Sequence, residues 1–221
     1  MGYNIAIDGP SGAGKSTISK EVAKRLGFVY IDTGAIYRAV GLYTFIRSKD
    51  PENAQEVTDL LPEINIDIVY KDGTQCVILN GEDVSEKIRM HEISDYASKV
   101  SAIPAVREFL LNKQRELALN NDAIMDGRDI GTVVLPDADL KIFLTASAQA
   151  RANRRYHELI SRNQTVDFDK VLSDIIERDK RDTERAIAPL KVADDAIVVD
   201  TSEIDFEQSL ERIINLILEH R

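Results

Sequence analysis

The sequence predicts an α/β fold in which helices cover both faces of a parallel five-stranded sheet. Short apolar runs alternate along the chain with segments of helical periodicity, and this alternation is typical of parallel sheets. A glycine-rich turn joins the first apolar run to the first helical segment. Apolar and polar residues also alternate on both sides of an Asp-Gly pair, which predicts a small antiparallel hairpin set into the fold.

The sheet is expected to be built from short runs rich in Val, Ile and Leu, as strands buried on both faces are. These runs are residues 3–8, 28–31, 123–126, 140–145 and 196–200. The predicted helices cover residues 16–27, 33–48, 104–120, 148–157, 169–183 and 206–219. Gly27 is a stop signal for the first helix, and Thr33 is a candidate cap for the second.

One segment departs from this alternation and reads as a β-hairpin. Strand-like patterns precede and follow KDGT at residues 71–74, within an insert at about 62–100. Such an insert is expected to have a small core of its own. The candidates for that core are Ile64, Ile66, Ile68, Val77 and Leu79. Cys76 is interpreted as a packing residue because no histidine pairs with it in the sequence.

These elements form one domain with three parts, which suits a chain of 221 residues. The core is predicted at residues 1–32, 101–150 and 164–221. A lobe at residues 33–100 carries the hairpin insert at about 62–100, and a short lid occupies about 151–163.

The composition is that of a globular protein, with 43% hydrophobic and 30% charged residues. A single cysteine excludes an internal disulfide and fits a reducing compartment. No apolar run approaches the length of a membrane span, and the first residues lack the basic region of a signal peptide, so a cytoplasmic protein is expected. The net charge of −10 argues against nonspecific binding to nucleic acid or an anionic membrane. No oligomer interface is evident, which leaves a monomer as the default.

The glycine-rich turn matches the phosphate-binding pattern G-x-x-x-x-G-K-[ST], and it stands where that pattern must stand, between a strand and a helix. Its backbone N–H groups and the helix N-terminus attract phosphate oxygens. Lys15 can reach the outer phosphates, and the Ser16 hydroxyl can bind a magnesium ion. The predicted ATP-binding residues of this loop are Gly9, Pro10, Ser11, Gly12, Ala13, Gly14, Lys15, Ser16 and Thr17.

The class of reaction follows by elimination. GTPases read guanine with N-K-x-D, whereas the nearest string here, NKQR at residues 112–115, lacks the aspartate. Motor and transporter ATPases need a longer chain than this one. A small kinase remains, which would move the terminal phosphoryl group of ATP to a small acceptor.

Three further clusters combine arginine with aspartate and predict an anionic acceptor. They are DTGAIYR at residues 32–38, DGRD at 126–129 and RDKRDTER at 178–185. The second follows a predicted strand, where ligands of parallel sheets bind. In the third, Arg178, Asp182 and Arg185 share one helix face. Fixed positive charge of this kind is needed when two phosphates must approach each other.

Together these strings resemble the bacterial cytidylate kinases over nearly the whole chain. The resemblance rests on IDGPSGAGKST, DTGAIYR, DGRDIGTVV and RDKRDTERAIAPL, with PDA at residues 136–138 and NGEDVS at 80–85. It implies direct in-line phosphoryl transfer from ATP, with Mg²⁺, to CMP or dCMP. It also implies that the lobe at residues 33–100 binds the acceptor and closes during the reaction together with the lid.

The resemblance also implies individual roles. Arg38 and Arg128 would bind the acceptor phosphate, and Arg178 with Asp182 the ribose. The base would be read by Ser98, Arg107 and Asp129, while Thr33 and Tyr37 line the pocket. The implied catalytic residues are Lys15, Arg128 and Arg185. Arg154 would join the ATP site, with Arg151 and Arg155 as further lid candidates, and Ser16 would be the metal ligand.

Two alternatives stay open at the level of the sequence. The chain could be a kinase for another small acceptor, such as UMP or shikimate. It could also be a regulator that binds ATP without turning over any acceptor. A panel of acceptors distinguishes all three.

Overall fold

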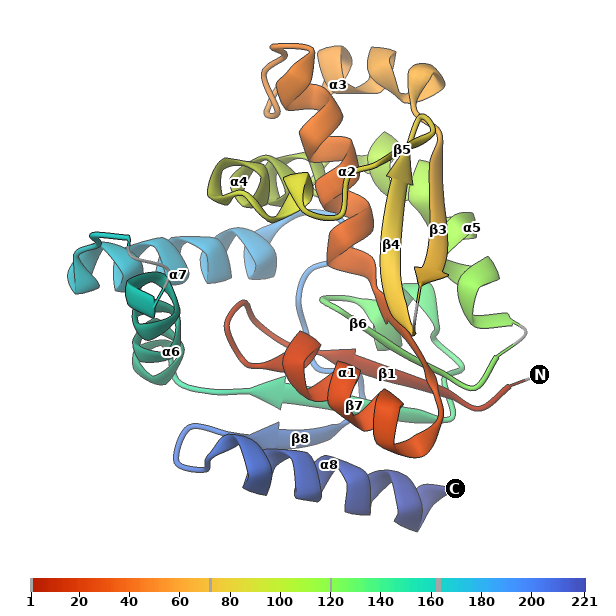
Figure 1. Cartoon of the computed structure of the whole chain (residues 1–221), viewed down its shortest axis with the longest axis vertical. Coiled ribbons are helices and arrows are strands. Elements are labelled where there is room, and N and C mark those ends of the chain that lie inside the picture. Colours follow the sequence, from red (N-terminus) through yellow and green to blue (C-terminus); the bar gives the residue numbers. More distant parts are fainter. Residues whose placement is uncertain (1, 72, 120, 162–163) are drawn as a thin grey trace.

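The computed structural model of the chain describes residues 2–71, 73–119, 121–161 and 164–221. Its central sheet has five strands in the order β2-β6-β1-β7-β8, and all neighbouring strands are parallel. The strands are β1 (Asn4–Asp8), β2 (Val29–Asp32), β6 (Ala123–Gly127), β7 (Leu140–Thr145) and β8 (Ile197–Asp200). The predicted parallel sheet is confirmed (Figure 1).

Helices cover both faces of this sheet, as predicted. Helices α1 (Lys15–Leu26) and α8 (Phe206–His220) lie on one face, and α5 (Pro104–Leu119) lies on the other. Strand β1 shows why helices cover both faces, because successive side chains of a strand point to opposite faces of the sheet. Ile5 and Ile7 pack in the core with α1 and α8, whereas Ala6 packs in the core that includes α5.

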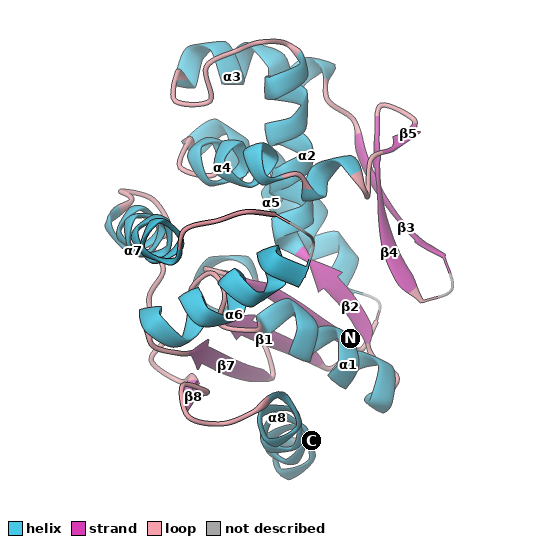
Figure 2. Ribbon diagram, turned by 60° about the vertical axis from the view of Figure 1, so that its left-hand side comes forward, coloured by secondary structure: helices cyan, strands magenta, loops and turns pink. Residues whose placement is uncertain are grey.

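A lobe of helices and a three-stranded antiparallel sheet stands above β2. It contains α2 (Thr33–Ile46), α3 (Ala54–Leu60), α4 (His91–Val100), β3 (Ile66–Lys71), β4 (Thr74–Leu79) and β5 (Glu82–Asp83). Short 3-10 turns lie at Leu61–Glu63 and Lys87–Arg89. Strands β3 and β4 form the predicted hairpin (Figure 2), although Asp72 of its turn lies outside the described residues.

The hairpin does not have the separate core that the sequence predicts. Ile66, Val77 and Leu79 are buried together with Ile36 and Val40 of α2. Helices α4 and α5 contribute to the same cluster. The hairpin is therefore packed as part of the lobe, because its apolar face is too small to be buried by itself.

Helices α6 (Ala148–Ser161) and α7 (Phe168–Glu184) pack against each other through a small apolar cluster that includes Ala152, Leu159, Val171 and Ile175. Helix α6 runs past the predicted end at 157, so the expected lid at 151–163 is helical as far as Ser161. Residues 162–163 lie outside the described part of the chain. No helix within the described ranges is long and apolar enough to cross a membrane.

The N-terminus of α2 differs from the prediction. Asp32, not Thr33, is the capping residue, and its Oδ1 accepts a hydrogen bond from the Ala35 N–H at 2.9 Å. Thr33 is the first helical residue, and its hydroxyl donates to the Asp126 carbonyl at 2.7 Å. The helix ends at Ile46 rather than at residue 48. The cap and the hydroxyl contact tie α2 to the carboxyl ends of β2 and β6.

Candidate functional site

The phosphate-binding loop runs from the end of β1 to the start of α1 through strongly turned backbone. Gly14, which precedes α1, is left-handed with φ 92°. Gly9 has φ 148°, and a Cβ on it would lie 1.9 Å from the Leu144 carbonyl oxygen of β7. The first glycine is therefore required by close contact with the neighbouring strand, and the loop packs directly against β7.

Lys15 lies inside this loop and is 6% exposed. Its Nζ donates hydrogen bonds to the carbonyl oxygens of Gly9 at 2.7 Å and Pro10 at 2.8 Å. Burial holds the pKa of the Lys15 ammonium well below its usual value, and Arg128 lowers it further, while Asp126 opposes the shift. An anion in the loop would favour the charged lysine, which suits a phosphate site.

Ser16 and Asp126 meet beside the loop. The Ser16 hydroxyl donates to Asp126 Oδ2 at 2.7 Å, and the Tyr30 hydroxyl lies 3.3 Å from Oδ1. Burial, together with the charge of Asp32, raises the pKa of Asp126 to about 6 against the opposing effect of Lys15. A hydroxyl and a buried carboxylate are oxygen donors of the kind that Mg²⁺ prefers, so these residues fit a magnesium ion.

Asp126 has no role in the sequence-based site, although its string was recognised there. The available signal was an acidic residue at the end of a buried strand, with a P-loop serine in the same predicted site. Sequence alone does not show that β6 lies next to β1, which brings Asp126 to Ser16.

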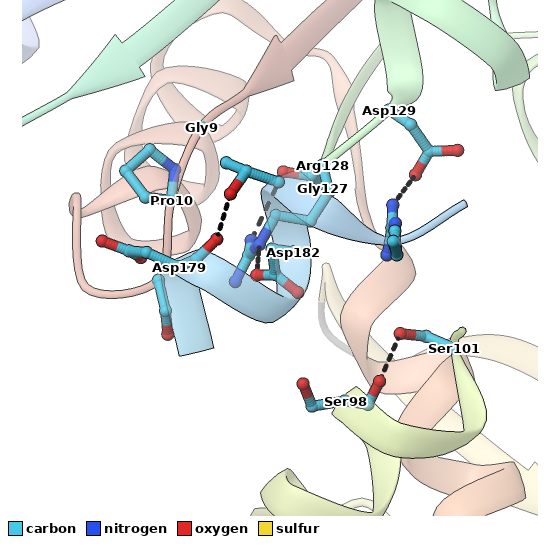
Figure 3. Close-up of polar contacts among 12 residues, drawn as sticks. Gly9, Pro10, Ser98, Ser101, Gly127, Arg128, Asp129, Asp179 and Asp182 are labelled. Atoms are coloured by element: carbon cyan, nitrogen blue, oxygen red, sulfur yellow. Dashed lines mark hydrogen bonds and ion pairs between the residues drawn. The ribbon is translucent and has the colours of Figure 1, made fainter. Parts of the chain in front are cut away.

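A group of four arginines, Arg38, Arg128, Arg178 and Arg181, gathers in the site, and three of them also pair with carboxylates. Arg128 Nε donates to Asp182 Oδ2 at 2.8 Å (Figure 3). The Nε atoms of Arg38, Arg178 and Arg181 are buried and have no hydrogen-bond partner among the described residues. Burial, together with the charge of Arg128, lowers the pKa of Arg178 to about 10. A bound anion would relieve both effects, so this cluster is a candidate phosphate site.

Arg38 comes to this cluster from α2 and is held by Asp32. Its Nη2 lies 2.7 Å from Asp32 Oδ2, while Oδ1 of the same carboxylate caps α2 through Ala35. The side chains of Arg38 and Asp32 are 24% and 20% exposed, so the pair is accessible from the site.

Asp129 is held between two arginines. Arg107 Nη2 donates to Oδ2, and Arg185 Nη2 lies 3.3 Å from Oδ1. Asp129 is 4% exposed, and Arg107 also stacks over the Tyr37 ring at 5.5 Å. The sequence assigns Arg107 and Asp129 to one base-reading group, and the structure brings these two into contact.

Two further residues expected in the site are Ser98 and Arg185. Ser98 is on α4, and its buried hydroxyl has no partner among the described residues (Figure 3). Arg185 contacts Asp129 and donates through Nε to the Ala188 carbonyl at 2.7 Å. Its described contacts are therefore with the base-reading group, not with the phosphate-binding loop.

Two of the three lid arginines contact the loop. Arg151 Nη1 donates to the Ser11 carbonyl at 3.0 Å. Arg154 Nη1 lies 3.5 Å from the Ala13 carbonyl, and its Nη2 donates to the Thr201 carbonyl at 2.5 Å. Arg155 instead pairs with Glu158 on its own helix at 2.8 Å.

The chain is similar to known proteins both in sequence and in fold. The family model described as cytidylate kinase matches residues 5–219. A cytidylate kinase of Caldicellulosiruptor bescii is 52% identical over 213 residues, covering 96% of this chain and 94% of that protein. One of Thermosipho melanesiensis is 48% identical over 219 residues, covering 99% and 98%. An uncharacterized protein from Eubacterium ventriosum has a similar fold at 15% identity, with a TM-score of 0.52 over 99% of both chains.

Proposed function

This chain belongs to the cytidylate kinase family, and from that premise we propose that it transfers the terminal phosphoryl group of ATP to CMP or dCMP. The products are ADP and the corresponding diphosphate. The observation that carries the proposal is the presence of two groups of positive charge in one site. One is the phosphate-binding loop with the buried Lys15, and the other is the arginine cluster, in which three Nε atoms are buried without a partner among the described residues. Arg128 of this cluster is close enough to Lys15 to lower its pKa.

The loop binds the donor, and its own residues supply the charge. Lys15 exchanges its two carbonyl partners for phosphate oxygens, and the backbone N–H groups at the start of α1 add to the attraction. Arg154, which lies against Ala13 and Thr201, belongs to the same donor site. Mg²⁺ bound with ATP would supply charge neutralisation between the phosphates, and Ser16 and Asp126 would hold it.

The arginine cluster binds the acceptor phosphate. Arg38 and Arg128 supply planar guanidinium donors that match phosphate oxygens, and Arg178 with Asp182 binds the ribose hydroxyls. An acceptor phosphate oxygen attacks the terminal phosphorus in line, and the bond from that phosphorus to the bridging oxygen of ADP breaks. Positioning and positive charge lower the barrier, so no covalent intermediate on the protein is required.

The base is read by the group around Asp129. Arg107 pairs with Asp129 and stacks over the Tyr37 ring, and Ser98 lies on helix α4. A carboxylate acceptor favours the exocyclic amine of cytosine and disfavours the carbonyl of uracil at the same place. Since Arg107 and Arg185 occupy both oxygens of Asp129 here, acceptor binding must share or replace one of these contacts.

The finer features of the protein follow the same proposal. The lobe at residues 33–100 binds the acceptor, and the α6–α7 region closes over the donor. We propose a monomer in a reducing, cytoplasmic compartment, and the single cysteine supports the reducing compartment. The net charge of −10 supports nucleotide substrates rather than nucleic acid.

A panel of acceptors tests the reaction. Release of ADP from Mg-ATP is measured with CMP, dCMP, UMP, AMP and shikimate, for wild type and Asp129→Ala. We expect the wild type to turn over CMP and dCMP rapidly. The Asp129→Ala variant should lose activity mainly with these two acceptors. If the protein turned over only shikimate or only UMP, that compound would replace CMP as the assigned acceptor. ATP binding without turnover of any acceptor would favour a regulator.

A further inference from the structure

Strand β2 is one of the two outer strands of the main sheet, and one side of it has no strand partner among the described residues. The Val29 N–H donates to the Asp122 carbonyl at 2.8 Å, so the backbone of Val29 faces β6. In a parallel strand the N–H and C=O of one residue point to the same side, and that side alternates along the strand. Tyr30 and Asp32 therefore direct their backbone groups away from the sheet.

The hairpin of the acceptor lobe supplies partners for these groups. Tyr70 of β3 and Gln75 of β4 are directly opposite each other in the hairpin. The Tyr70 hydroxyl donates to the Tyr30 carbonyl at 3.1 Å. Gln75 Oε1 accepts from the Asp32 N–H at 2.8 Å, and its Nε2 donates to the Asp32 carbonyl at 3.2 Å. The turn end of the hairpin lies beside the sheet in both views (Figures 1 and 2).

Asp32 connects this contact to the acceptor phosphate site. Gln75 fixes its backbone on both sides, while its carboxylate caps α2 and binds Arg38 at 2.7 Å. The packing leaves little freedom, because a Cβ on Gly34 would lie 3.1 Å from both Arg38 Nη1 and Asp32 Oδ1. A displacement of the Asp32 backbone would therefore move the Arg38 guanidinium.

We propose that Gln75 is a positioning residue of the acceptor site, which holds Asp32 so that Arg38 is presented to the acceptor phosphate. The inference rests on the proposed function, because it takes Arg38 as a phosphate ligand. It gives the hairpin a role in substrate binding without any contact between hairpin and substrate. An amide suits this place, since its separate oxygen and nitrogen atoms can bind the N–H and the C=O of one residue at the same time.

Replacement of Gln75 by leucine tests this role, because leucine keeps the approximate size and loses both hydrogen bonds. We expect the KM for CMP to rise ~5-fold in Gln75→Leu, as loss of about one net hydrogen bond implies, while kcat stays within about two-fold. The Kd of ATP, measured by calorimetry, stays unchanged. Gln75→Asn keeps the amide but shortens the side chain, and it should behave in the same way if leucine lowers stability.

Tyr70→Phe is the matched control. It removes a hydrogen bond from the same hairpin to the same strand, but at Tyr30 rather than Asp32. Its KM for CMP should stay within about two-fold of wild type. An equal rise in both variants would mean that the hairpin only docks the lobe, and the positioning role of Gln75 would be wrong.

Two further measurements separate positioning from general structure. Gln75→Leu should weaken binding of CMP but not of cytidine, which has no phosphate. In an Arg38→Met background, Gln75→Leu should cause no further rise in KM. An effect on cytidine, or a full effect without Arg38, would contradict the inference. A wild-type protein that does not phosphorylate CMP contradicts the proposed function, whereas an active enzyme with an unchanged Gln75→Leu variant contradicts only the inference.

Discussion

Single residues of the site hold charges that their surroundings oppose. Lys15 has a pKa below its usual value, Asp126 has one raised to about 6, and burial is the first cause in both. Such shifts gather where a site must hold a substrate charge. The free energy of unfolding is lower than it would be with neutral side chains at these positions, and a bound nucleotide would recover part of the lost stability.

The pH dependence of stability tests this loss of stability at another buried carboxyl group, that of Asp8. Its carboxylate accepts from the N–H groups of Ile130 at 2.8 Å and Gly131 at 2.7 Å, and burial raises its pKa to about 6. Between about pH 4 and pH 6 the folded protein therefore binds a proton that the unfolded chain has released. The contribution of Asp8 to stability is present below about pH 4 and is lost as the pH rises through 6.

We expect the difference in unfolding free energy, wild type minus Asp8→Asn, to fall by about 3 kcal/mol between pH 4 and pH 7. About two pKa units at ~1.4 kcal/mol each give this value. Urea denaturation at a series of pH values measures it. A difference that does not change with pH would mean that Asp8 has an ordinary pKa in the folded protein.

Gly9 offers a second test at this scale. A Cβ there would lie 1.9 Å from the Leu144 carbonyl oxygen, so Gly9→Ala must move the loop or β7. We expect a loss of several kcal/mol in stability, together with loss of ATP binding. Gly27→Ala is the control, because Gly27 has φ 76° but no atom within 4 Å of the added Cβ, and it should cost only about 1 kcal/mol. Thermal unfolding and ATP titration of both variants measure the difference.

At the scale of elements, the sequence predicts the strands well because their apolar runs are buried on both faces. The prediction that Thr33 caps α2 was wrong for a local reason. Asp32 and Thr33 are adjacent, and both residue types cap helices. Arg38, one turn into the helix, binds Asp32, while the Thr33 hydroxyl is occupied by the Asp126 carbonyl.

The other differences come from contacts between elements far apart in the sequence. The apolar pattern of the hairpin identifies its buried face but not its partner, which is α2. The segment Ile130–Val134 forms a π-helical turn, not foreseen, and the carboxylate of Asp8 binds its first N–H groups. The role of Asp126 depends on the position of β6 beside β1. Local periodicity carries no information of this kind.

The pairing of α6 with α7 leads to a prediction for Arg151. This residue is 4% exposed, and it binds Asp179 of α7 through both Nη atoms, at 2.9 and 2.5 Å. It also donates to the Ser11 carbonyl of the phosphate-binding loop. Lysine cannot make these contacts together because its ammonium is a single point of charge.

We expect Arg151→Lys to lower the free energy of unfolding by about 2–3 kcal/mol and to raise the KM for ATP several-fold. Arg155→Lys is the control, since its pair with Glu158 lies within one helix and its side chain is 33% exposed. It should change neither quantity appreciably. Denaturation curves and ATP kinetics check both variants, and similar behaviour of the two would show that Arg151 does not join the helices to the loop.

At the scale of the whole molecule, one ion pair connects the acceptor lobe with the α6–α7 region. Asp95 of α4 lies 3.0 Å from Arg181 of α7, and both side chains are partly exposed. The two helices also carry Ser98 and Asp182, so the pair spans the proposed acceptor site.

An exposed pair of this kind contributes less than about 1 kcal/mol to stability. We expect Asp95→Asn to change the unfolding free energy by no more than that, and to raise the KM for CMP about 2–3-fold. The rise should become smaller at high salt, which screens the pair. Glu52→Gln is the matched control, because it removes a pair with Lys99 of α4 that does not reach α7. A larger effect of Glu52→Gln on the KM would contradict the role of the Asp95–Arg181 pair.

The covered side of β2 also bears on how separate molecules of this protein meet. An outer strand with free N–H and C=O groups is a template for a strand from another chain, and such pairing leads to aggregation. At β2, Tyr70 occupies the carbonyl of Tyr30, and Gln75 occupies both backbone groups of Asp32. Side chains, rather than another strand, close this rim of the sheet. The contact that we propose to align the acceptor site should thus also hinder pairing of β2 with a strand from another copy of the protein.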